Sequence, residues 1–66
     1  MIDESQGNIA RVEMESLFYK NRGKVPPVGT PDHIRYNKLL DVLKEAFGEE
    51  RLGGVIAEIK MRATER

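Results

Sequence analysis

The stretch "TPDHIRYNKLLDVLKEAFG", residues 30–48, decides the fold because it contains both a start and a stop signal for a helix. Thr30 is a residue type that caps helix N-termini, and Pro31 suits the first helical position, where no N–H is needed. Asp32 places a negative charge at the positive end of the helix dipole. Gly48 follows the last apolar residue, as a terminating glycine does. The sequence therefore predicts a helix over residues 31–47.

Apolar residues in this segment recur with the 3.6-residue period of a helix and cover an arc of roughly 160°. They are Tyr36, Leu39, Leu40, Val42, Leu43, Ala46 and Phe47. Because the arc is wider than packing against one neighbour requires, we expect this helix to contact at least two others and to form the spine of the core.

Two further segments show helical spacing. In residues 9–22, Asn8 is a candidate N-cap and Gly23 would follow the last turn. One face of this helix would carry Ala10, Met14, Leu17 and Phe18, and a second, narrower strip would carry Ile9, Val12 and Tyr19. After residue 51 a second apolar stripe runs through Leu52, Val55, Ile56, Ile59 and Ala63, and we expect a helix over residues 54–63. Gly53 and Gly54 interrupt its beginning, and either mark a turn or allow a close approach of two helices.

The predicted fold is all-α, a small three-helix domain with a proline-containing linker between the first two helices. The alternative is an α+β fold with one short strand region, over residues 9–16 or 54–61. Charged and apolar residues alternate in the first segment, and the second contains Val55, Ile56 and Ile59. We expect residues 1–8 to be a flexible N-terminus and residues 9–66 to be a single helical domain.

All three prolines and the single histidine lie between residues 24 and 36. Pro26 and Pro27 fix φ and keep the chain extended, whereas Gly29 allows it to turn. The run "KVPPV" lacks the PxxP pattern of a polyproline ligand and is interpreted as a linker. His33 falls in the first turn of a helix and is expected to be an ordinary polar residue.

The composition argues against an enzyme. The chain has 66 residues, no cysteine and one histidine, so neither a disulfide nor a thiolate metal site is available. Its few hydroxyl groups stand in no recognisable nucleophile motif. We therefore predict no catalytic residue, no metal, no cofactor and no small-molecule substrate.

Charge is neutral overall but unevenly distributed, because residues 20–38 contain five basic groups and one acidic group. This permits an alternative function, a compact DNA- or RNA-binding regulator resembling a helix-turn-helix protein. Its phosphate contacts would be Lys20, Arg22, Lys24, Arg35, Lys38, Lys60 and Arg62. The neutral net charge and the long, acidic turn "FGEERLGG" count against it.

The favoured function is a small non-enzymatic protein–protein interaction module, a regulator or adaptor that forms homo-oligomers or docks on a larger complex. A chain this short cannot cover all of its apolar stripes, and surplus apolar surface is typical of interaction sites. The predicted partner-binding residues are Tyr36, Leu40, Leu43, Phe47, Val55 and Ile59. No apolar run is long enough to cross a membrane, and the opening "MIDESQGN" is too polar for a signal peptide, so we expect a cytoplasmic protein.

Overall fold

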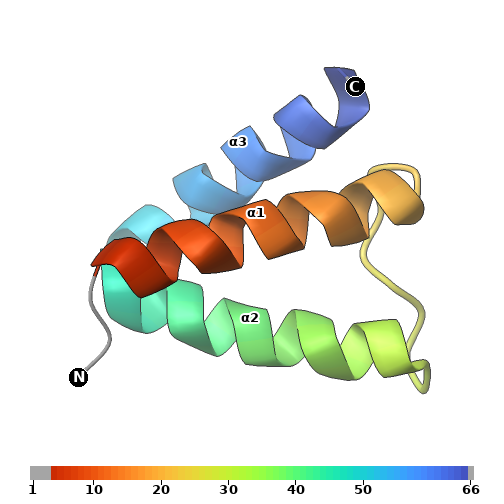
Figure 1. The fold of residues 1–66 in the computed structure, drawn as a ribbon, viewed down its shortest axis with the longest axis horizontal. Helices are drawn as coiled ribbons and strands as arrows, with labels where there is room; N and C mark the ends of the chain where they lie inside the picture. The colour runs from red at the N-terminus through yellow and green to blue at the C-terminus, as the bar shows by residue number, and fades with distance from the viewer. Residues whose placement is uncertain (1–3, 66) are drawn as a thin grey trace.

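The computed structural model describes residues 4–65, which form three α-helices in chain order (Figure 1). The helices are α1 (Glu4–Lys20), α2 (Pro31–Phe47) and α3 (Glu49–Glu65). The all-α prediction is confirmed. The α+β alternative is wrong, because residues 9–16 lie within α1 and residues 54–61 lie within α3.

The helix at the centre of the arrangement is α1, not α2 as the sequence suggested. Helices α2 and α3 meet at Gly48 and diverge from it, and α1 lies between them (Figure 1). Accordingly α1 packs more extensively on α2 and on α3 than those two pack on each other. The wide apolar arc of α2 misled the prediction because only Leu39 and Leu43 of that arc are fully buried.

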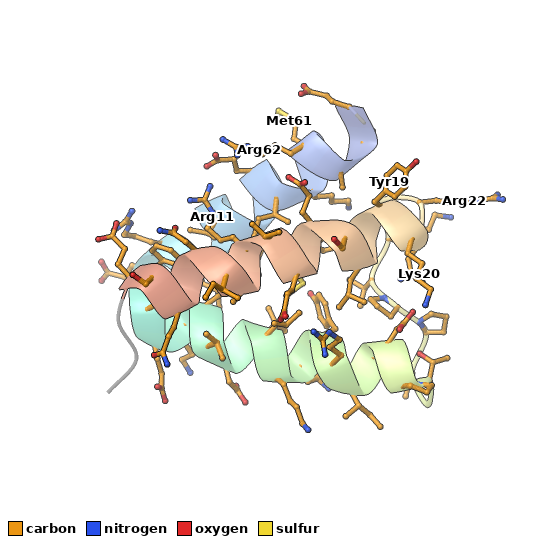
Figure 2. All side chains as sticks on the ribbon, viewed as in Figure 1. Arg11, Tyr19, Lys20, Arg22, Met61 and Arg62 are labelled. Carbon is orange, nitrogen blue, oxygen red and sulfur yellow. The ribbon has the colours of Figure 1, made fainter. Side chains whose placement is uncertain are left out.

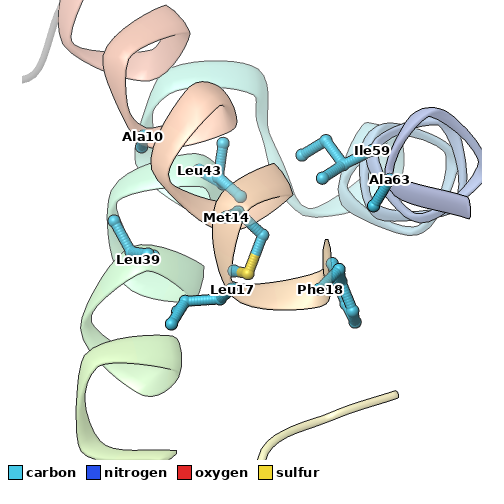
Figure 3. Packing of buried hydrophobic residues seen from close by; sticks show 8 residues of the cluster. All are labelled: Ala10, Met14, Leu17, Phe18, Leu39, Leu43, Ile59 and Ala63. Carbon is cyan, nitrogen blue, oxygen red and sulfur yellow. The ribbon is translucent and has the colours of Figure 1, made fainter. Parts of the chain in front are cut away.

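The core is a single cluster to which all three helices contribute (Figure 3). Its buried members are Ala10, Met14, Leu17, Phe18, Leu39, Leu43, Ile59 and Ala63. The ring of Phe18 meets that of Tyr36 edge-on, with centroids 5.9 Å apart and planes at 82°, the geometry that aromatic quadrupoles favour. Among the described residues, every buried side-chain nitrogen and oxygen has a hydrogen-bond partner.

The first helix begins at Glu4, five residues before the predicted start, so Asn8 is an interior residue and not the N-cap. The residue that makes this extension possible is Gly7, which is buried where α1 passes the end of α2. A Cβ atom at Gly7 would lie 2.6 Å from the Cβ of Ala46 and 2.9 Å from the Phe47 ring. Residues 1–3 of the predicted flexible N-terminus lie outside the described part of the chain.

The first helix ends at Lys20, two residues before the predicted end, in a Schellman motif that includes Gly23. The N–H of Gly23 donates to the Phe18 carbonyl at 2.6 Å, and the N–H of Arg22 donates to the Tyr19 carbonyl at 3.3 Å. This pair of bonds satisfies carbonyls that the helix itself leaves free. It requires the left-handed conformation at Arg22, whose φ is 58°.

The predicted start of α2 is confirmed, and His33 has a structural task that the sequence did not reveal. The hydroxyl of Thr30 accepts from the His33 N–H at 3.2 Å and donates to the Pro27 carbonyl at 2.7 Å. Nδ1 of His33 lies 3.0 Å from the Pro26 carbonyl oxygen. Since Pro26 is itself fully buried, the connector is tied to the first turn of α2 on both sides of Pro27.

The third helix starts at Glu49, so the predicted turn before Val55 is wrong. The N–H of Gly48 donates to the Lys44 carbonyl at 2.9 Å and closes α2, and the next residue begins α3 with acidic side chains in its first turn. Gly53 and Gly54 lie inside this helix on its exposed side. No atom lies within 4 Å of the Cβ position of either one, so neither mediates a close helix approach.

Candidate functional site

The residues predicted to bind a partner belong mainly to the interior of the domain. Leu43 is 0% exposed and Ile59 is 2% exposed, so neither is available at the surface and their assignment to a contact surface is wrong. Their spacing is that of an amphipathic stripe, and here that stripe faces the chain's own core. The other four are partly buried and pack against this core, namely Tyr36, Leu40, Phe47 and Val55.

The largest group of exposed apolar residues on one element lies on α1. Ile9 is 61% exposed, Val12 is 64% exposed and Tyr19 is 55% exposed. At 100° per residue these three point away from the buried side of α1, which carries Ala10 and Met14. The narrow strip that the sequence indicated therefore exists, and it faces solvent.

Two exposed serines complete this strip, and we call the five residues together the α1 solvent face. They are Ser5, Ile9, Val12, Ser16 and Tyr19. The face contains no charged residue over more than four helical turns, although 33% of the chain is charged. Contiguous apolar surface bordered by polar groups is the usual composition of a protein-binding site.

Shallow hollows border the α1 solvent face on both sides. One of about 230 Å³ lies toward α2 and is lined by Gln6, Ile9, Ala10, Glu13, Leu39 and Val42. Another of about 140 Å³ lies toward α3 and is lined by Asn8, Arg11, Val12, Glu15, Ile59 and Arg62. Ile9 and Val12 therefore protrude between the two hollows, and the side chains of an opposing helix can pack around them.

Ion pairs along both borders tie α1 to its neighbours. Toward α2, Arg35 contacts Glu13 at 2.9 Å. Toward α3, Glu58 accepts from Arg11 at 3.1 Å and from Arg62 at 3.0 Å. Pairs this exposed contribute little to stability individually, but they hold the charged side chains beside the α1 solvent face and leave its centre apolar.

The residues proposed for nucleic-acid binding do not form one patch. Lys20 pairs with Asp32 at 3.2 Å, and Arg35 and Arg62 are held in the pairs already described. Arg62 belongs to the last turn of α3 and pairs with Glu58 of the same helix, whereas Lys20 is the last residue of α1 and Arg22 follows it (Figure 2). The others are exposed on separate elements, Lys24 in the connector, Lys38 on α2 and Lys60 on α3. The predicted acidic turn is reduced to Gly48, and the nucleic-acid hypothesis stays a prediction.

A third hollow, of about 480 Å³, lies where the ends of α1 and α3 meet and is lined by Tyr19, Lys20, Arg22, Gly23, Ala63 and Thr64. Both helices direct their C-terminal carbonyls toward this end, so the dipoles attract the basic groups there. Lys20 belongs to the last turn of α1, which is an ordinary stabilising position for a lysine.

Other exposed apolar residues are dispersed. Val25 and Val28 lie in the connector, Ile34 lies on α2 and Met61 lies on α3. Between the two valines, Pro26 is fully buried, so the connector cannot offer a free polyproline segment to a groove. Single exposed apolar residues are normal on protein surfaces, which leaves α1 as the element with a continuous strip.

The described residues 4–65 contain no group of three or more acidic or histidine side chains placed to hold a metal ion. Burial raises the pKa of Tyr36 above its ordinary value, and this residue packs against the core. None of the helices in this part of the chain is both long and apolar enough to cross a membrane.

The sequence contained the signal for the whole α1 solvent face, since its five members alternate at intervals of four and three residues. The predicted helix began at residue 9 and so excluded Ser5. The predicted strip consisted of apolar residues alone and therefore also omitted Ser16.

Comparison of the chain with protein-family models, with curated proteins and with solved structures gives no match.

Proposed function

We propose that the chain is a small non-enzymatic protein-binding module, a regulator or adaptor that acts in the cytoplasm through the α1 solvent face. The observation that carries this proposal is the exposure of Ile9, Val12 and Tyr19 on one uncharged side of α1. Most surface helices have a polar outer side. The helix α1 has a second apolar side, opposite the one that it buries in the core. We infer that a partner covers this second side, as the core covers the first.

The cost of binding is reduced because the face is already built. A helix of 17 residues is marginal in isolation, but α1 is held by the core and by the ion pairs on both borders. A partner therefore does not need to fold it, and the conformational entropy lost on binding is limited to side chains. Tyr19 adds a large contact area with only two side-chain torsions to immobilise.

Site-specific photo-crosslinking in the native cells tests this proposal. A photoreactive residue replaces Val12 in one variant and Ala57, which is exposed on α3, in the control. We expect discrete protein adducts from position 12, formed either with another protein or with a second copy of the chain, and no matching adducts from position 57. Absence of adducts at both positions, in a chain that remains folded, would contradict the proposal.

A further inference from the structure

The five residues of the α1 solvent face follow a strict heptad pattern. Ser5, Ile9, Val12, Ser16 and Tyr19 are separated by four, three, four and three residues, which is the spacing of the a and d positions of a coiled coil. Ile9 and Ser16 occupy a positions, and Val12 occupies a d position. The f position between them is Met14, which is fully buried in the core. The line of a and d residues, which we call the seam, is the α1 solvent face, and it therefore points directly away from the domain.

We propose that the α1 solvent face binds the same face of a second copy, so that two α1 helices pair in parallel and in register. This inference rests on the proposed function and names its partner. Each residue of the seam would meet its own counterpart, with Ile9 against Ile9 and Val12 against Val12. A β-branched residue at an a position favours two-stranded coiled coils. The residues that α1 buries in the core, Ala10, Met14 and Leu17 among them, lie on the half of the helix opposite this face.

The charges beside the seam favour the parallel orientation. Glu15 occupies a g position and Lys20 occupies the following e position. In a parallel pair each g residue lies beside the e residue five positions later on the other helix, so two Glu15–Lys20 pairs form across the dimer. The side chain of Lys20 is 70% exposed and lies 3.2 Å from Asp32, and its ammonium group has further donors for a second carboxylate.

An antiparallel pair lacks these contacts and leaves one of the five residues of the face without a counterpart. In that orientation e positions face e positions and g positions face g positions. In the register that places Ile9 against Tyr19, Glu13 faces Glu13 and Glu15 faces Glu15, which is repulsive. Displacing the helices by one heptad places these glutamates beside Gln6 and Asn8, which are neutral. Only the parallel arrangement uses the whole seam and also pairs opposite charges.

The expected affinity is low. A helix of 17 residues is about 25 Å long, and its contact with a second helix is smaller than the roughly 800 Å² per partner of a standard stable interface. We expect a dissociation constant weaker than about 1 µM, so that the association responds to the concentration of the chain in the cell.

Thiol exchange tests both the pairing and its direction, since the chain has no cysteine. Ser5→Cys and Ser16→Cys chains, one of them mass-tagged, are mixed in a glutathione redox buffer, with Ala57→Cys as the control. The parallel seam predicts that positions 5 and 16 each link to themselves at least tenfold more than position 57 does. Mixed 5–16 disulfides would overturn the orientation. Self-linkage at positions 5 and 16 no greater than at position 57 would overturn the second copy as partner.

A charge variant provides an independent readout. In the Glu15→Lys variant, each proposed contact between residue 15 of one copy and Lys20 of the other joins two lysines, which should reduce the disulfide linkage of Ser16→Cys chains several-fold. Glu45→Lys, on the exposed side of α2, should leave that linkage unchanged. Equal linkage in both variants would overturn the assigned charge pairs. Photo-crosslinks from position 12 to another protein, without self-linkage at positions 5 and 16, would refute this inference and leave the proposed function standing.

Discussion

Replacing Gly7 by Ala tests whether α1 really packs on the end of α2 as described. In a helix interior Ala is normally preferred to Gly by about 1 kcal/mol. At this position, however, the new Cβ would lie 2.6 Å from the Cβ of Ala46, about 1 Å closer than carbon atoms pack. Both atoms are fixed to helix backbones, so the two helices must separate, and overpacking of this kind costs about 1–3 kcal/mol.

We therefore expect Gly7→Ala to destabilise the domain by up to about 2 kcal/mol, which is the overpacking cost less the gain in helix propensity. Gly53→Ala is the matched control, because the Cβ position there has no atom within 4 Å and the change should stabilise by about 0.5–1 kcal/mol. Urea unfolding and thermal melts of both variants measure the two effects, and each kcal/mol should move the melting temperature by about 4–8 °C.

The opposite signs of the two glycine variants are the essential result. The double variant Gly7→Ala, Ala46→Gly removes the shortest contact and should recover part of the loss, with a coupling free energy of at least about 0.5 kcal/mol. If Gly7→Ala stabilised the domain as Gly53→Ala does, the close approach of α1 and α2 would be refuted, and with it the early start of α1.

Three further changes test other parts of the fold. Thr30→Ala removes the N-cap of α2 and should cost about 1 kcal/mol in a urea unfolding curve, whereas an unchanged curve would contradict the role of the Thr30 hydroxyl. Arg22→Gly relieves the left-handed backbone at φ 58° and should stabilise the domain by about 1 kcal/mol in the same assay. Burial raises the pKa of Tyr36 above 10.0, so its contribution to stability is complete below pH 10.0 and is lost as pH rises through the folded-state pKa. Unfolding curves from pH 8 to 11 should show this loss in the natural chain and a smaller one in Tyr36→Phe; identical pH profiles would contradict it.

The sequence predicted best the elements whose boundaries depend on local chemistry. The bounds of α2 were predicted correctly because Thr30, Pro31 and Gly48 act on their own backbone neighbours. The start of α1 was missed because Asn8 has the chemistry of an N-cap, and the contact of Gly7 with Ala46, which holds the first turn against α2, is not visible in the sequence. The start of α3 was missed because Gly53 and Gly54 suggested a turn or a close helix approach, whereas they are tolerated inside that helix without any contact that requires glycine.

The candidate site was harder to predict than the fold. Helical periodicity shows that a stripe will be buried, but it does not show whether the chain itself or a partner buries it. The strongest stripes, which contain Leu43 and Ile59, are satisfied inside the domain. The weaker strip on α1 is the one left exposed, and only the placement of α1 between α2 and α3 reveals it.

Sedimentation equilibrium over a wide concentration range tests the central claim most directly. The natural chain should change from the mass of one copy at about 1 µM to that of two copies toward 1 mM, given the small interface. Val12→Glu should remain monomeric with an unchanged melting curve, because Val12 is 64% exposed in the single domain. Met61→Glu, at a residue that is 62% exposed on α3, should associate like the natural chain. A natural chain that stays monomeric to 1 mM, or a Val12→Glu variant that associates as the natural chain does, would contradict pairing through the α1 solvent face.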